Sequence, residues 1–138
     1  MSKVSPEQTA IYQKNFKDKQ RRLGLCLECM RPNDGTILCT FHREADRLRD
    51  RERNRSLRKA VLAYYGQVCA CCGESEERFL VIDHVNNDGA AHRKVTKGSG
   101  YKTYLWIVMN EFPDGFQTLC HNCNMGKSMN GGVCPHVG

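Results

Sequence analysis

Residues 119–127 read LCHNCNMGK, and this stretch is the strongest single indication of the fold. Cys120 and Cys123 form a C-x-x-C pair, the spacing at which two thiolates bind one zinc ion. A second pair, Cys69 and Cys72, lies in the stretch CACCG at residues 69–73. Because two such pairs complete a tetrahedral site, we predict that zinc ties these two stretches together.

A second candidate zinc site lies in the N-terminal part of the chain, with the spacing C-x2-C-x9-C-x2-H over residues 26–42. The first residues lack the apolar core of a secretory signal, and no apolar run approaches the roughly 18 residues of a membrane span. We therefore expect a cytoplasmic protein without a membrane partner, in which thiols bind metal rather than form disulfides. Two structural zinc ions then account for seven of the nine cysteines, the N-terminal set being Cys26, Cys29, Cys39 and His42.

The positive charge is concentrated in one segment. The chain has a net charge of +6, and residues 43–59 contain eight basic and four acidic side chains. We expect a long helix over residues 40–65, on which basic residues recur every fourth position and form one stripe. Such a stripe favours a nucleic-acid partner, and the alternative is a solvated helix stabilised by its own ion pairs. The stripe comprises Arg43, Arg47, Arg51, Arg55 and Lys59.

The remaining pattern predicts an α+β protein stabilised by zinc. We expect three parts, namely a helix with the Cys3His module at residues 1–42, a basic connecting helix at 43–66 and a C-terminal domain at 67–138. The turn and capping signals predict helices at 6–23, 40–65 and 101–112, strands at 78–85 and 116–120, a polar loop at 86–100, and a last helix from Asn124 to Gly131.

Four polar residues are expected to converge in the C-terminal domain. Asp83 and His84 end the apolar run FLVI, where a core tolerates such groups only at a cost. Asn124 and Lys127 follow directly after the last cysteine of the predicted zinc site. Zinc would therefore fix these two residues relative to the Asp-His pair, which is the pattern expected where a metal is held at a cleft.

The stretches CACCG, VIDHV, FQTLCHNCNMGK and GGVCPH together resemble the HNH endonucleases, also called ββα-metal or His-Me finger nucleases. The resemblance covers residues 69–136 and is strongest to small HNH proteins of bacteriophages and mobile elements. It implies a DNA endonuclease in which His84 is the general base and Lys127 contacts a phosphate. It also implies that Asp83 and Asn124 hold one Mg²⁺ or Mn²⁺, and that the four-cysteine zinc site is structural.

Two positions depart from the family pattern. The middle asparagine, which orients the loop bearing the histidine, corresponds to a position near Gly115, so another group such as a backbone carbonyl must replace it. The third motif ends in Asn124 where many members have histidine, and an amide oxygen suits Mg²⁺ or Mn²⁺.

Several roles stay open at the level of sequence. His92 and Arg93 either contact DNA, line the site or belong to a solvated loop, and Cys134 and His136 either cap the domain, form a further site or have no role. The alternative functions are a non-catalytic double-zinc module that binds nucleic acid, and a thiol redox or zinc-storage protein. One HNH site cuts one strand, so a double-strand break would need a homodimer, two nicks or a partner.

Overall fold

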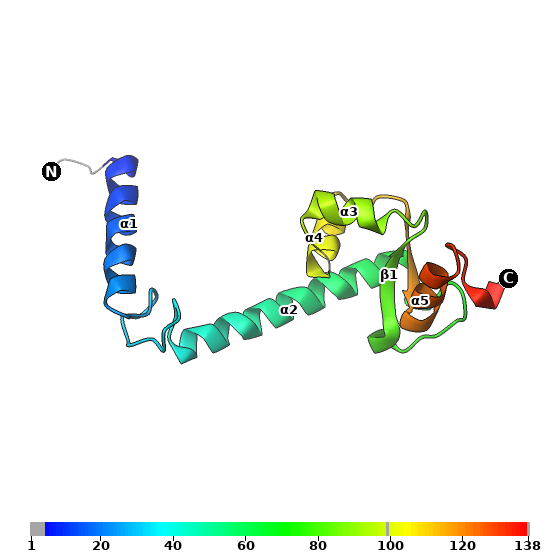
Figure 1. The fold of residues 1–138 in the computed structure, drawn as a ribbon, viewed down its shortest axis with the longest axis horizontal. Coiled ribbons are helices and arrows are strands. Elements are labelled where there is room, and N and C mark those ends of the chain that lie inside the picture. The colour runs from blue at the N-terminus through cyan, green and yellow to red at the C-terminus, as the bar shows by residue number, and fades with distance from the viewer. Residues whose placement is uncertain (1–4, 99, 138) are drawn as a thin grey trace. The chain divides into compact units, whose positions relative to one another are not determined.

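The computed structural model describes residues 5–98 and 100–137. Within these ranges the chain forms five α-helices and one two-stranded antiparallel sheet, so the predicted α+β class is confirmed. The chain divides into two compact units, Met1–Arg51 and Glu52–Gly138. The division falls inside the long helix α2 (Thr40–Tyr65), which therefore contributes residues to both units (Figure 1). None of the described helices has the length and apolar character that crossing a membrane requires.

The N-terminal unit begins with α1 (Pro6–Arg22), whose start is fixed by a capping box between Ser5 and Gln8. The backbone N–H of Gln8 donates to Ser5 Oγ, and the Ser5 N–H donates to Gln8 Oε1. Beyond the helix, Gly24 adopts a left-handed φ of +64°, which ends the helix where the sequence predicted. The buried Gln20 side chain then donates to the Cys26 carbonyl at 3.1 Å, and this bond links α1 to the cysteine-rich segment.

Helix α2 has the bounds that the sequence predicts and ends at Gly66, whose φ is +117°. The apolar positions of this helix that the sequence pattern places against the C-terminal unit are Ala60, Val61 and Tyr64. Val61 is buried as expected, whereas Ala60 and Tyr64 are exposed. Leu62 is buried as well and belongs to the core cluster of the hairpin.

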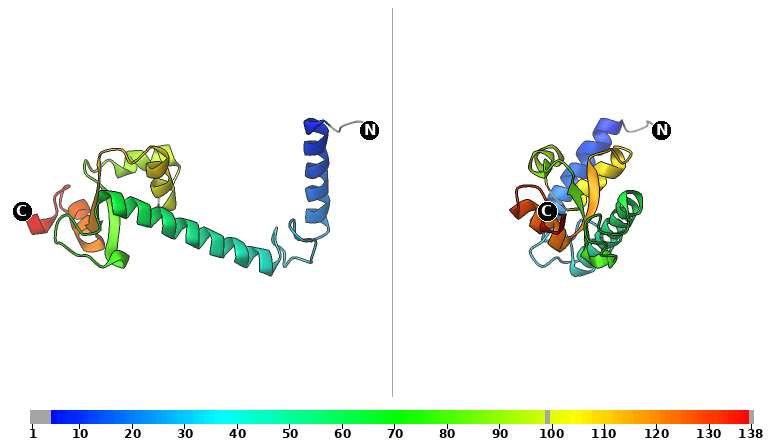
Figure 2. Two further views of the ribbon diagram at one scale, coloured as in Figure 1. Left: turned by 180° about the vertical axis from the view of Figure 1, so that it is seen from behind. Right: turned by 90° about the vertical axis from the view of Figure 1, so that its right-hand side faces the viewer.

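The C-terminal unit is built on the hairpin of β1 (Leu80–His84) and β2 (Phe116–Cys120). Leu80 pairs with Cys120 and Asp83 pairs with Gln117 in the antiparallel register. Helix α5 (His121–Met129) follows β2 directly and contacts both strands (Figures 1 and 2). The core of this unit is small and contains the buried residues Leu62, Leu80, Leu119, Cys69, Cys120, Cys123 and Cys134.

Two of the expected element starts are corrected by the structure. The strand begins at Leu80 rather than at residue 78, because Glu77–Phe79 form a 3-10 turn capped by the Glu76 side chain. Helix α5 begins at His121 rather than at Asn124, since Cys120 acts as its N-cap and accepts from the Cys123 N–H.

The segment expected to be a polar loop also contains a helix, α3 (Gly89–Thr96), which packs on α4 (Tyr101–Met109). The tail, expected to be irregular, ends in a 3-10 turn, η2 (Pro135–Val137).

Candidate functional site

The N-terminal cysteine-histidine cluster could hold a metal ion, as the sequence predicts. The ligand atoms of its four residues all lie within 4.8 Å of one another. Cys29 Sγ lies 3.7 Å from Cys39 Sγ, and Cys39 Sγ lies 3.4 Å from His42 Nδ1. Tetrahedral zinc with ordinary bond lengths places two sulfurs about 3.8 Å apart and a sulfur and a nitrogen about 3.6 Å apart. The cluster is therefore close to the geometry that zinc requires.

Local hydrogen bonds favour the thiolate of Cys26 in this cluster. Burial opposes ionisation of Cys26, but backbone N–H groups of Cys39 and Glu28 lower the pKa of its thiol to about 6. The adjacent turn is braced by Arg43, whose guanidinium lies 2.6 Å from Asp34 Oδ2 and holds the pKa of that carboxyl at about 2. Arg43 was predicted to contact DNA, but its charge is already paired within the N-terminal unit.

The four-cysteine cluster of the C-terminal unit is also assembled, by Cys69, Cys72, Cys120 and Cys123. Cys72 Sγ lies 3.7 Å from Cys120 Sγ, close to the spacing expected around zinc. The hairpin register and a bond from the Ala70 N–H to the Thr118 carbonyl at 2.9 Å bring the two C-x-x-C pairs together. Burial opposes ionisation of Cys69, but backbone N–H groups lower the pKa of its thiol to about 6.

A third cluster contains the cysteines that the sequence left without a site. Cys71, Cys123, Cys134 and His136 place their ligand atoms within 4.8 Å of one another. Cys123 belongs to both this cluster and the four-cysteine cluster. The sequence signal for this arrangement was limited to Cys71 and Cys134, which belong to neither predicted zinc site, and to His136 two residues after Cys134.

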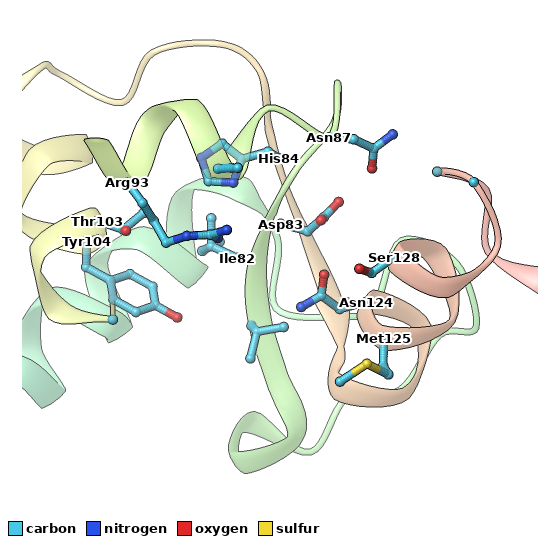
Figure 3. Close-up of a pocket in the computed structure, with 16 residues that line it drawn as sticks. Ile82, Asp83, His84, Asn87, Arg93, Thr103, Tyr104, Asn124, Met125 and Ser128 are labelled. Carbon is cyan, nitrogen blue, oxygen red and sulfur yellow. The ribbon is translucent and has the colours of Figure 1, made fainter. Parts of the chain in front are cut away.

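Three of the four predicted active-site residues line one pocket of about 680 Å³ in the C-terminal unit. Asp83 and His84 come from the end of β1, and Asn124 comes from the first turn of α5. Figure 3 shows Asp83 on the side of β1 toward Asn124 and Ser128, and His84 on the side toward α3. The alternation along the strand therefore separates the acid from the imidazole, yet both reach the same pocket.

Asp83 is held by two side chains. Lys127 Nζ lies 2.6 Å from Asp83 Oδ2, and both side chains are about nine-tenths buried. Gln117, the partner of Asp83 in the hairpin register, donates to the same oxygen at 2.8 Å. Sequence reasoning missed Gln117, because only the register reveals that it faces Asp83.

Further contacts of Lys127 argue against the phosphate contact predicted for it. Its ammonium also donates to the backbone carbonyls of His84 at 2.7 Å and Val85 at 3.1 Å. With three oxygen acceptors and 6 % exposure, Lys127 has no donor directed at a substrate phosphate. It instead fastens the end of β1 to α5 and so positions the Asp-His pair.

His84 is paired with a second histidine. His84 Nε2 lies 2.8 Å from His92 Nδ1, and the His92 ring packs edge-on against Trp106 at 4.3 Å between centroids. Burial, together with the charge of His92, lowers the pKa of His84 below its ordinary value, so the ring is neutral at neutral pH. His92 was predicted to contact DNA or line the site, and the structure makes it the partner of His84. Arg93 lines the pocket, and its contact with DNA stays a prediction.

The Gly115 carbonyl holds the start of the loop that follows the histidine. The Val85 N–H, directly after His84, donates to this carbonyl at 2.9 Å. That the carbonyl takes over the task of the middle asparagine stays a prediction.

Three arginines of the basic stripe on α2 are exposed. Arg47, Arg51 and Arg55 form no ion pair within the described residues. Elsewhere on the helix Arg49 pairs with Asp46 three residues before it. Contact of the stripe with nucleic acid stays a prediction.

A comparison with models of known protein families, with curated proteins and with solved structures finds no match for this chain.

Proposed function

We propose that the chain is a metal-dependent DNA endonuclease of the HNH type, with its active site in the pocket of the C-terminal unit. One observation carries the proposal: a carboxylate, an imidazole of lowered pKa and an amide line the same pocket, next to a cluster that could hold structural zinc. These are the residues Asp83, His84 and Asn124, to which the resemblance assigns the chemistry.

The donors in the pocket fit a hard divalent cation. The Asp83 carboxylate and the Asn124 amide offer oxygen ligands of the kind that Mg²⁺ and Mn²⁺ prefer. Among residues 5–98 and 100–137, both hydrogen bonds to Asp83 go to Oδ2, which leaves Oδ1 for a cation. Such a cation, when bound, would stabilise the negative charge that develops at the scissile phosphate.

His84 takes the proton of the attacking water in this proposal. Its Nε2 is engaged by His92, so Nδ1 is the nitrogen that accepts the proton. Nδ1 lies beside Gly89, where a Cβ would be only 3.0 Å away, and the missing side chain leaves room for water. Because burial keeps the ring neutral, His84 is in its basic form over the physiological pH range.

Duplex DNA is the proposed substrate. The exposed arginines of α2 can neutralise backbone phosphates, and Arg93 adds a positive charge at the edge of the pocket. Contacts of this type position a duplex without selecting its sequence. A single pocket would nick one strand, and a double-strand break would need a second copy of the chain, two successive nicks or a partner.

One observation favours a second candidate, the non-catalytic double-zinc module that binds nucleic acid. The Lys127 ammonium already neutralises Asp83, and a positive charge at this distance weakens the carboxylate as a cation ligand. In this alternative the polar residues of the pocket are structural, and only the basic surface is functional.

Cleavage of supercoiled plasmid distinguishes the two candidates. Zinc-loaded protein is incubated with plasmid in Mg²⁺, in Mn²⁺ and without either ion, while DNA binding is measured by gel shift in parallel. We expect open-circular product only with added Mg²⁺ or Mn²⁺. DNA binding without cleavage under all three conditions would contradict the endonuclease and support the binding module.

A further inference from the structure

We propose that the C-terminal unit holds two zinc ions rather than one, and that the Cys123 thiolate bridges them. The first ion is bound by Cys69, Cys72, Cys120 and Cys123. The second is bound by Cys71, Cys123, Cys134 and His136, whose ligand atoms lie within 4.8 Å of one another.

The spacing within the second set suits zinc. Cys123 Sγ lies 3.3 Å from His136 Nδ1, close to the roughly 3.6 Å expected between a sulfur and a nitrogen on tetrahedral zinc. Three thiolates and one imidazole are also the donor set of the N-terminal cluster, where Cys39 Sγ and His42 Nδ1 are separated by 3.4 Å. The second set therefore has the same donor atoms as the N-terminal cluster and a nearly equal distance between sulfur and nitrogen.

Cys123 lies between the two sets. Its sulfur lies within 4.8 Å of those of Cys72 and Cys120 in the first set and of those of Cys71 and Cys134 in the second. The residue is fully buried at the first turn of α5, so its position is fixed by the helix and by the core around it. A thiolate sulfur carries three lone pairs and can bind two zinc ions at once.

The ligand count and the charge also agree with a bridge. All nine cysteines, with His42 and His136, belong to the three clusters, and these eleven side chains fill twelve ligand positions because Cys123 counts twice. The second ion brings two positive charges and two further thiolates, those of Cys71 and Cys134. It therefore adds no net charge to the buried cluster, which avoids the cost of an unbalanced charge.

The second ion would fasten the tail to the wall of the active-site pocket. Cys134 is buried, and Pro135 approaches α5 so closely that a Cβ on Gly126 would lie 3.0 Å from its Cδ. The turn just before Cys134 contains Gly131 and Gly132, which line the pocket. We infer that an ion at this place holds that turn against the pocket.

Native mass spectrometry of the full chain, purified with excess zinc, tests the bridge. We expect three zinc ions per chain in the wild type and two in His136→Ala, because only the second ion depends on His136. The matched control is His121→Ala, which removes an exposed histidine of α5 that belongs to no cluster and should retain three zinc ions. The readout is metal content, so it is independent of whether the chain cleaves DNA.

A second measurement needs no variant. After exchange of zinc for ¹¹³Cd, NMR of the wild type should show three cadmium signals, two of them coupled through the shared sulfur. Two ions in the wild type, three ions in His136→Ala, or three uncoupled signals would each overturn the proposal. So would a Cys71–Cys134 disulfide, detected as the loss of two hydrogens in the denatured, unreduced protein.

Discussion

Replacing Lys127 with methionine should destabilise the C-terminal unit strongly, because Lys127 is the counter-charge of a buried carboxylate. The ammonium donates to Asp83 at 2.6 Å and to two backbone carbonyls at the end of β1. Methionine has a similar length but provides neither the charge nor the donors. Asp83 would then keep only its bond from Gln117.

The size of the effect follows from burial. Side-chain exposures of 7 % for Lys127 and 10 % for Asp83 leave little water to screen the pair. Breaking a buried pair by removing one partner costs about 3–5 kcal/mol. Removing both charges in Lys127→Met with Asp83→Asn should cost less than the sum of the single changes, with a coupling of about 0.5–3 kcal/mol.

Denaturant unfolding followed by fluorescence measures this loss. The one tryptophan of the chain, Trp106, lies in the C-terminal unit against His92 and reports on the unit that contains the pair. Unfolding is performed with excess zinc, so that metal loss does not obscure the result. The matched control is Lys94→Met on the exposed surface of α3, which should change the unfolding free energy by less than about 0.5 kcal/mol.

The opposite result would restore the phosphate contact. If Lys127→Met unfolds at nearly the wild-type denaturant concentration but binds DNA more weakly, the ammonium serves a substrate and the positioning role assigned to it is refuted.

Three further predictions concern the base and the basic helix. Gly89→Ala should leave stability nearly unchanged but slow cleavage by roughly tenfold to a hundredfold, because the new Cβ crowds His84 Nδ1 at 3.0 Å; unimpaired cleavage would exclude that nitrogen as the base. His92→Gln should move the acid limb of the pH–rate profile to higher pH, because the charge of His92 helps hold the pKa of His84 down and the base acts only when neutral. An unshifted acid limb would mean that a group other than His84 titrates there. Replacing the exposed Arg47, Arg51 and Arg55 of α2 with alanine should reduce the slope of log DNA affinity against log salt by roughly two to three. An unchanged slope would remove the helix from the DNA interface.

The sequence predicts features that depend on local signals. The bounds of α1 and α2 follow from Ser5, Gly24 and Gly66, whose capping and left-handed conformations need no distant partner. The two predicted ligand sets follow from the C-x-x-C spacing, since one ion must close each set. The convergence of Asp83 and Asn124 follows in turn, because the zinc cluster and the hairpin join their elements.

Features that depend on tertiary contact were missed or misassigned. Lys127 follows the zinc motif as a phosphate-binding residue would, and only the packing of α5 on β1 shows that it is buried against Asp83. The helix α3 has a sequence typical of a loop and is stabilised by its contact with α4. His92 becomes the partner of His84 only because that helix brings it there.

Cleavage by His84→Ala tests the proposed mechanism most directly. Plasmid nicking with Mg²⁺ is measured for the wild type, for His84→Ala and for the control His121→Ala, together with zinc content and DNA affinity. We expect His84→Ala to lose at least about a hundredfold in rate, the minimum typical of a general base, while zinc content and DNA affinity stay at wild-type levels. Wild-type cleavage by His84→Ala would contradict the assignment of this pocket as the active site.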